Sequence, residues 1–141
     1  MAMEVNLVAV GAATATMFAV GAIWYMLPFG KIWGKIHGFD KLSKKQQKEM
    51  QSKMGPWYLA QLIFTVISAY VLAVLINLMP AQSPYYVAFL VWLGVSLPTT
   101  AGNMIFGGSP EGYVWHKTLI TAGETLLHLL AAAWVISAIA G

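Results

Sequence analysis

Residues 109–141 read SPEGYVWHKTLITAGETLLHLLAAAWVISAIAG, and the fold predicted for the chain follows from this stretch. It is the last of four long apolar segments. At about 1.5 Å of rise per residue, it is long enough to cross a hydrocarbon core of about 30 Å. We expect a helix over about 110–140, with Ser109 as its cap, Pro110 in its first position and Glu111 complementing the helix dipole.

Four polar residues lie on one face of this predicted helix. Lys117, Thr121, Glu124 and His128 follow one another at the spacing that aligns side chains along a helix. Glu124 comes about nine residues after Trp115, hence roughly 13 Å along the helix and close to the middle of a bilayer. An ionised carboxylate at that depth costs at least ~2.5 kcal/mol, so this position calls for a structural or functional reason. His128 is one turn away and can share a hydrogen bond or a proton with Glu124.

The composition of the chain favours a membrane protein. Of its 141 residues, 59% are hydrophobic and 9% are charged, whereas soluble domains usually carry about 25% charged residues. Cysteine is absent and all eight basic side chains are lysine. Disulfides, zinc thiolate sites and catalytic cysteines are therefore excluded, as is the bidentate arginine clamp for phosphates and carboxylates.

Three further apolar segments precede residues 109–141. They are expected to form helices over about 5–27, 56–79 and 84–106. With the last segment they predict one domain over 1–141, an all-α integral membrane protein with four transmembrane helices in a bundle. Trp24 and Tyr25, at the end of the first segment, sit where an aromatic belt would lie.

The loop over 28–55 is basic and is expected to lie at the membrane interface. It contains seven of the eight lysines, between Lys31 and Lys53, which predicts that it is cytoplasmic and that both termini lie outside. Ser43 and Gln46 have the spacing of a capping box for a short polar helix. Anionic lipid head groups are the predicted partners of this loop, at roughly 1 kcal/mol per lysine. The lysines expected to contact them are Lys31, Lys35, Lys44, Lys45 and Lys48.

The second and third segments carry polar residues that could face Glu124. In the second, Gln61, Thr65 and Ser68 form a polar stripe on one face. In the third, Pro98 removes a backbone hydrogen bond, which should leave the carbonyl of Gly94 without its usual partner and kink the helix. Thr99 and Asn103 lie beside this break. A broken helix with polar residues can mark a binding site, or its hydroxyl groups can simply satisfy the freed backbone.

Several of these motifs resemble a known family. Residues 21–33, GAIWYMLPFGKIW, resemble the signature after the first helix of a small bacterial membrane family, catalogued as domain of unknown function 1761. Trp92-Leu-Gly94, with Pro98 and Phe106, resembles its third helix, and residues 119–123, LITAG, resemble the opening of its fourth. Members often carry Asn where this chain has Thr121. The resemblance implies a four-helix protein of the bacterial inner membrane and supplies no activity.

A second family of similar size and helix count is disfavoured. The membrane-bound glutathione-utilising enzymes resemble this chain in both respects, but their substrate-binding pattern relies on arginines, and this chain has none.

Three hypotheses of function remain open. In the first, Glu124 and His128 line a path or site for a proton or small solute, as in an oligomeric channel or transporter. In the second, they hydrogen-bond across helices and act as packing glue in a structural or accessory subunit of a membrane complex. In the third, Glu124 is the general acid or base of a membrane enzyme with a lipid-phase substrate.

The expected partners follow from these hypotheses. The lipid bilayer surrounds the chain, a homo-oligomer or a larger membrane complex completes its small interior, and nucleic acid is not expected. No cofactor is predicted, because a Glu-x-x-x-His pair supplies only two ligands and disfavours haem or metal binding through His128. The polar intramembrane site predicted from the sequence consists of Glu124, His128, Thr121, Asn103, Thr99 and Gln61.

Overall fold

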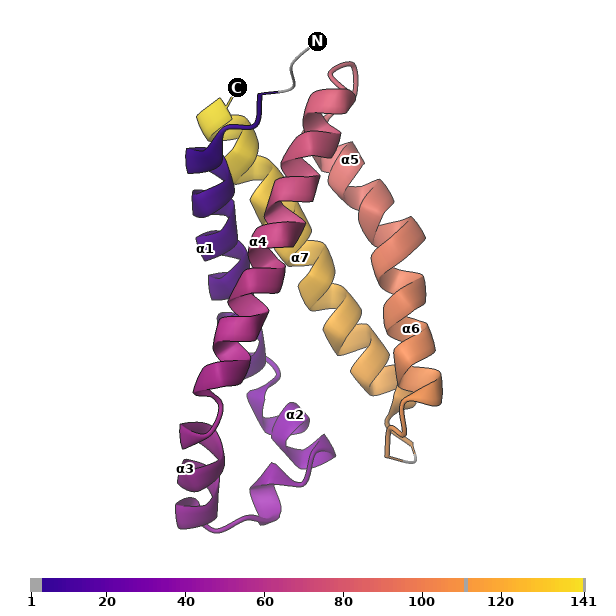
Figure 1. Cartoon of the computed structure of the whole chain (residues 1–141). Helices are drawn as coiled ribbons and strands as arrows, with labels where there is room; N and C mark the ends of the chain where they lie inside the picture. Colours follow the sequence, from indigo (N-terminus) through magenta and orange to yellow (C-terminus); the bar gives the residue numbers. More distant parts are fainter. Residues whose placement is uncertain (1–3, 111, 141) are drawn as a thin grey trace.

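Every regular element in the described part of the chain, residues 4–110 and 112–140, is helical. The computed structural model in Figure 1 shows four long helical segments and a group of short helices between the first two. In chain order the elements are α1 (Leu7–Met26), α2 (Gly30–Ile36), the 3-10 helix η1 (Phe39–Lys41), α3 (Lys44–Ser52), α4 (Gly55–Leu78), α5 (Pro84–Val91), the π-helical turn η2 (Trp92–Ser96), α6 (Leu97–Phe106) and α7 (Val114–Ala140).

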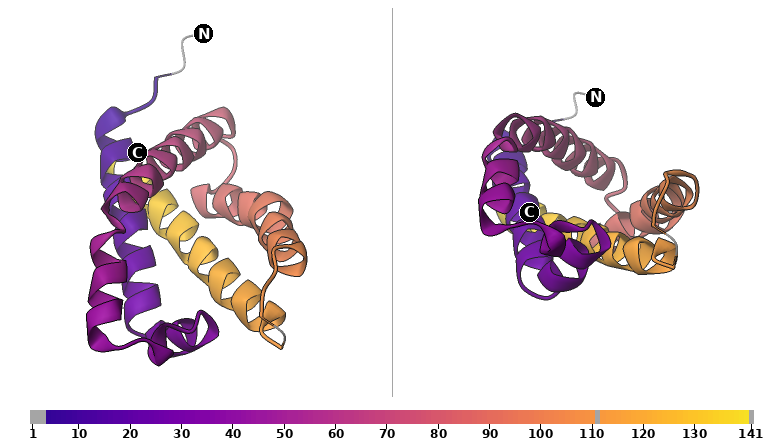
Figure 2. Two further views of the ribbon diagram at one scale, coloured as in Figure 1. Left: turned by 60° about the horizontal axis from the view of Figure 1, so that its bottom comes forward. Right: turned by 90° about the horizontal axis from the view of Figure 1, so that it is seen from below.

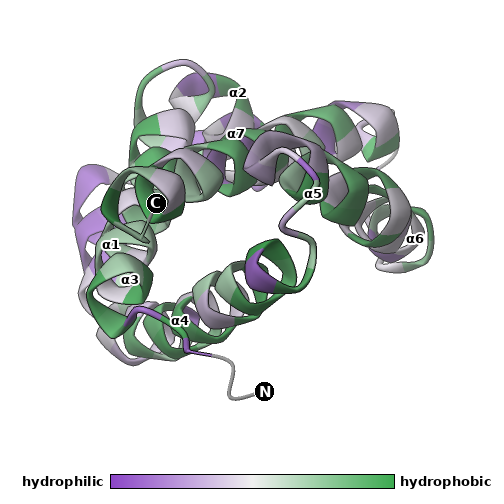
Figure 3. Ribbon diagram, turned by 90° about the horizontal axis from the view of Figure 1, so that it is seen from above, coloured by the Kyte–Doolittle hydropathy of each residue, from purple (hydrophilic) through white to green (hydrophobic). Residues whose placement is uncertain are grey.

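Four segments are long and apolar enough to cross a membrane. They are α1, α4, the continuous segment Pro84–Phe106 that comprises α5, η2 and α6, and α7. Hydrophobic residues run around the long helices (Figure 3), and many large ones are exposed on α4 and α5, among them Phe64 and Phe89. The predicted all-helical fold with four apolar segments of membrane-crossing length is thus confirmed.

The helix α7 contacts all the other long segments. It packs most extensively against α1 and also contacts α5, η2, α6 and, over a shorter length, α4. The helices α4 and α5 meet at their connection and diverge below it (Figure 1). The short helices α2 and α3 lie beyond the lower ends of α1 and α4 (Figures 1 and 2). At the opposite end of the molecule, a small cavity is lined by residues that include Glu4, Asn77 and Ala140. The first and last described residues of the chain therefore lie close together.

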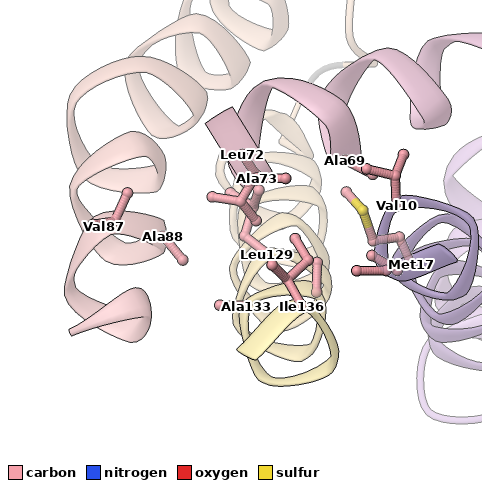
Figure 4. Close-up of a cluster of buried hydrophobic side chains, with 13 residues drawn as sticks. Val10, Met17, Ala69, Leu72, Ala73, Val87, Ala88, Leu129, Ala133 and Ile136 are labelled. Atoms are coloured by element: carbon pink, nitrogen blue, oxygen red, sulfur yellow. The ribbon is translucent and has the colours of Figure 1, made fainter. Parts of the chain in front are cut away.

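The hydrophobic core lies where α7 meets its neighbours, and it is built largely from alanine. Side chains from α1, α4 and α5 converge on Leu129, Ala133 and Ile136 of α7 (Figure 4). Ala9, Ala13, Ala132 and Ala133 are completely buried. Small side chains let helix backbones approach closely, which is how helices pack when few large side chains fill the space between them.

Two helix starts lie where the sequence predicts them, one of them with its predicted capping box. The hydroxyl of Ser43 accepts a hydrogen bond from the backbone N–H of Gln46, and the side chain of Gln46 accepts one from the N–H of Ser43, which completes the capping box of α3. Ser83 caps α5 in the same manner through the N–H of Tyr85, with Pro84 in the first helical position.

The predicted start of the last helix is wrong by several residues. Helix α7 begins at Val114, because Gly112 has a left-handed backbone, with φ of 82°, that cannot belong to a right-handed helix. Ser109 is not its cap: its hydroxyl donates to the carbonyl of Met104 and so closes the end of α6. The predicted role of Glu111 lies outside the described residues.

The predicted break at Pro98 takes the form of a π turn. Over Trp92–Ser96 the hydrogen-bond spacing widens, and the N–H of Leu97 donates to the carbonyl of Trp92, five residues earlier. Pro98 follows directly, in the first turn of α6. The wider turn shifts the helical register just before the residue that has no N–H to donate, so α5, η2 and α6 form one continuous helical segment (Figure 1).

Candidate functional site

The centre of the candidate site is a hydrogen-bonded pair near the middle of α7. Nδ1 of His128 lies 2.8 Å from Oε1 of Glu124, one turn away on the same helix. Glu124 is buried, with 8% of its surface exposed, and His128 is partly buried. At this distance the contact requires a proton: the imidazole N–H donates to the carboxylate, or the carboxylic O–H donates to the ring nitrogen. The pair therefore holds at least one proton between its members.

The pair faces a cavity of about 810 Å³ between α1, α4 and α7, which we call the central cavity. It reaches from Met26 and Tyr58, at the ends of α1 and α4 nearest α2 and α3, to His128 in the middle of α7. The full lining consists of Met17, Phe18, Gly21, Ala22, Tyr25 and Met26 from α1, Tyr58, Gln61, Thr65 and Ser68 from α4, and Thr121, Glu124, Thr125 and His128 from α7. A volume of this size suits a small organic molecule.

Helix α1 makes room for the carboxylate through a glycine. A Cβ atom on Gly21 would lie 3.2 Å from Oε1 of Glu124, closer than side-chain carbon atoms normally come to a neighbour. The absent side chain thus lets α1 and α7 pack closely while the carboxylate stays inside the cavity. Gly11, on the same helix, is the contrasting case, because a Cβ there would meet no atom within 4 Å.

Two tryptophans hold the adjoining turn of α7 from different sides. The indole N–H of Trp24 on α1 donates to the carbonyl of Ile120 at 2.9 Å, and that of Trp92 on η2 donates to the carbonyl of Ala122 at 2.8 Å. Gly123 packs against the ring of Trp24. Trp24, predicted as part of an aromatic belt, is half-buried and forms a contact between helices. These bonds fix the turn of α7 from which Glu124 projects.

An aromatic cluster lies at the end of the cavity nearest α2. The ring of Trp33 packs on Tyr25 and on His37, with centroids 4.8 and 4.6 Å apart, and the Nζ of Lys117 lies 5.7 Å from the Trp33 centroid. Lys117 was predicted on the same stripe as Glu124, but it contacts α2 and does not line the cavity. Burial and, secondly, the charge of Lys117 lower the pKa of His37 below its ordinary value of 6.5.

The structure brings together four of the six residues predicted for the polar site. Glu124, His128, Thr121 and Gln61 all line the central cavity. Gln61 is linked to Thr65 by a contact of 3.4 Å between the amide nitrogen and the hydroxyl oxygen. The tyrosine hydroxyl of Tyr25 is 3.5 Å from that of Thr121 and joins α1 to this polar surface.

The other two predicted residues lie elsewhere. Thr99 and Asn103 are exposed on α6 and are not part of the lining. The reason is that α6 contacts α7 from the side away from α1 (Figures 1 and 3), whereas the cavity is bounded by α1, α4 and α7. The five lysines predicted to contact lipid head groups, Lys31, Lys35, Lys44, Lys45 and Lys48, are all exposed on α2 and α3.

The contribution of α1 to the site was missing from the sequence-based prediction. Gly21 and Tyr25 line the cavity, yet the sequence had indicated for Tyr25 only a place in an aromatic belt at the membrane interface. The spacing of Gly21 and Tyr25, one helical turn apart, was the available signal. By contrast, the polar stripe of Gln61, Thr65 and Ser68 on α4 does face the cavity as a unit.

Comparison with known proteins gives a family and nothing closer. The model of the family described as protein of unknown function (DUF1761) matches residues 8–137, nearly the whole chain. No curated protein and no solved structure matches. Three stretches that carry the resemblance meet in the structure, since Trp24 and Trp92 bond to the turn that contains Thr121, Ala122 and Gly123. Among the described residues, no group of three or more His, Asp or Glu side chains is arranged to hold a metal ion.

Proposed function

The chain belongs to the DUF1761 family of proteins of unknown function, and we propose that it is a multi-pass membrane protein that moves a small solute through the central cavity in exchange for a proton. The four long helical segments would cross the bilayer, with Glu124 and His128 near its middle. The family assigns no reaction, so the proposal rests on the geometry of the pair and of the cavity.

The distribution of exposed side chains supports membrane insertion. Large hydrophobic residues are exposed along the long helices, including Trp57, Phe64, Leu119 and Trp134. Exposed apolar surface this extensive is typical of contact with lipid or with a partner and is rare on soluble monomers. The seven lysines of residues 31–53 favour a cytoplasmic position for α2 and α3 and an outside position for the opposite end of the molecule, in the inner membrane of a bacterium.

The partners of Glu124 and His128 are the observation that carries the proposal. Within the described residues, the hydrogen bond that each side chain makes is to the other, on the same helix. Polar residues that stabilise helix packing form hydrogen bonds between helices. Here Trp24 and Trp92 form such bonds to α7. A buried carboxylate is costly in a bilayer, and carboxylates that face an interior cavity there mark ion or solute pathways.

The shape of the central cavity supports a role in transport. It begins at the ends of α1 and α4 near the basic loop and extends to the middle of α7. The cavity is lined along this length by a polar surface made of Gln61, Thr65, Ser68 and Thr121. A solute that enters at this end therefore meets hydrogen-bonding groups until it reaches the Glu124–His128 pair, the deepest ionisable groups in the lining.

The test is transport by purified protein in liposomes that contain a pH-sensitive dye. A panel of small cationic, neutral and anionic amphiphiles is added outside, and empty liposomes report the leak. At least one class should change the internal pH only when protein is present. Glu124→Gln should abolish this change, while Glu49→Gln, the same substitution at an exposed site on α3, should preserve it. A folded wild-type protein that responds to none of the panel, or an undiminished response of Glu124→Gln, would refute the proposal.

A further inference from the structure

The ionisable side chains of the central cavity are few. Among the described residues, its only acidic side chain is Glu124, and its only basic one is His128, which is hydrogen-bonded to that carboxylate. None of the eight lysines is in the lining. A solute bound there therefore meets a carboxylate with no fixed positive charge beside it.

Aromatic and sulfur-containing side chains line the same cavity as this carboxylate. Phe18, Tyr25 and Tyr58 line the cavity together with Met17 and Met26. The faces of aromatic rings attract cations, and the attraction is strongest for ions that shed their water easily, such as quaternary ammonium or phosphonium groups. Methionine side chains are soft and adapt to irregular apolar ligands. The lining combines the features that suit an organic cation with an apolar body.

From this arrangement we propose that the ligand of the central cavity is an organic cation, and that it binds to Glu124 by displacing the proton that Glu124 shares with His128. This inference rests on the proposed function and names the class of solute for the same site. The exchange follows from charge balance. For the exchange, the resting pair must carry one proton more than a neutral imidazole beside a carboxylate, so that it is neutral overall, as imidazolium with carboxylate or as imidazole with carboxylic acid. After binding, the cation neutralises the carboxylate, and one proton leaves to water in either case.

Other ionisable groups near the pair do not alter this balance. From α1 and α4 the cavity receives the phenols of Tyr25 and Tyr58 and no lysine or further carboxylate, and α5, η2 and α6 contribute no side chain to its lining. Lys117, the lysine of α7, contacts the Trp33 ring outside the cavity. The lysines of α2 and α3 raise the potential at the surface, but salt and anionic lipid screen them over about 10 Å. Selection by charge therefore falls to Glu124.

The experiment compares three probes of similar shape and different charge. Tetraphenylphosphonium, tetraphenylborate and triphenylphosphine oxide are titrated into the protein in nanodiscs, with protein-free nanodiscs as the blank. Calorimetry in two buffers of different ionisation heat counts the protons released. Tetraphenylphosphonium should bind with release of close to one proton. Its Kd should fall by up to about tenfold for each unit by which the pH rises, as long as the free pair still carries the shared proton. Tetraphenylborate should not bind.

Variants connect the binding to the carboxylate. Glu124→Gln should weaken tetraphenylphosphonium at least about tenfold and remove its pH dependence, and Glu49→Gln should leave both unchanged. Gly21→Ala keeps the carboxylate but places a methyl group 3.2 Å from its oxygen, so it should weaken binding. Gly11→Ala, where the added atom meets nothing within 4 Å, should not. The Gly21→Ala comparison keeps the test decisive if Glu124→Gln does not fold.

The outcomes separate this inference from the proposed function. Binding of triphenylphosphine oxide or tetraphenylborate but not of tetraphenylphosphonium would overturn the cation class and leave a solute site in place. Cation binding without proton release, or with the same affinity in Glu124→Gln, would overturn the exchange. Absence of binding by all three probes would overturn the inference, and the liposome panel would then judge the proposed function independently.

Discussion

A methyl group at Gly123 should disrupt the contact between α1 and α7. In Gly123→Ala the new Cβ would lie 3.1 Å from Cζ2 and 3.5 Å from Cη2 of Trp24. The first distance is a few tenths of an ångström shorter than an ordinary contact. The Trp24 ring cannot simply retreat, because its N–H is bonded to the carbonyl of Ile120 at 2.9 Å. The helix must therefore shift or the hydrogen bond must lengthen.

The expected magnitude comes from two opposing effects. Overpacking in a tight interior costs about 1–3 kcal/mol, while alanine gains up to about 1 kcal/mol over glycine inside a helix. Gly123→Ala should therefore lower the free energy of unfolding by up to about 2 kcal/mol. Gly11→Ala should raise it or leave it unchanged, because a Cβ at Gly11 meets open space. The gain in helix propensity from glycine to alanine is the same in both variants, so the difference in their stabilities measures the packing cost at Gly123.

The assay is reversible unfolding in mixed micelles with increasing denaturing detergent, followed by circular dichroism and tryptophan fluorescence. A double-mutant cycle with Trp24→Phe isolates the contact, because phenylalanine lacks the Cζ2 and Cη2 atoms that the methyl group meets. The cost of Gly123→Ala should be smaller in the Trp24→Phe background. Equal stabilities of Gly123→Ala and Gly11→Ala, with no coupling in the cycle, would refute the packing of α1 against α7 described above.

Three further predictions concern the loop region and the topology. Because the chain has no cysteine, Lys48→Cys and Gln82→Cys each provide a single labelling site. A membrane-impermeant maleimide applied to intact cells should modify the Gln82→Cys variant and leave the Lys48→Cys variant unmodified. The reverse pattern would show that the orientation in the membrane is opposite to the one proposed. The pKa of His37, followed by NMR, should lie below 6.5 because of burial and the charge of Lys117, and Lys117→Met should raise it part of the way back. As the pH falls through 6.5, His37 is protonated in the unfolded chain before it is protonated in the folded one, so acidification should destabilise the fold. A pKa of 6.5 or above for His37 would contradict this. Ser43→Ala removes the cap of α3 and should increase amide hydrogen exchange throughout α3, as expected for a local loss of about 1 kcal/mol; unchanged exchange would argue against the capping box.

Much of the local structure could be predicted because local sequence is its cause. The apolar length of the four segments determines that they are long helices, whatever surrounds them. The capping box at Ser43 and the start of α5 at Pro84 depend only on residues within one turn. The Glu124–His128 bond was likewise accessible, because i and i+4 side chains of one helix must lie close together. The start of α7 was missed because Gly112 adopts a left-handed backbone, a conformation that glycine permits without requiring.

The composition of the site depended on how the helices pack. Nothing in the spacing of Thr99 and Asn103 reveals that α6 contacts α7 away from the cavity, or that Tyr25 and Gly21 of α1 face Glu124 instead. The rotation of each helix about its axis follows from contacts between segments far apart in the chain, such as the bonds of Trp24 to Ile120 and of Trp92 to Ala122. Hydrophobic periodicity is also a weak guide here, because these helices are apolar on nearly every face. The sequence alone therefore placed a buried carboxylate beside a histidine, and the packing of α1, α4 and α7 supplied the cavity that the pair faces.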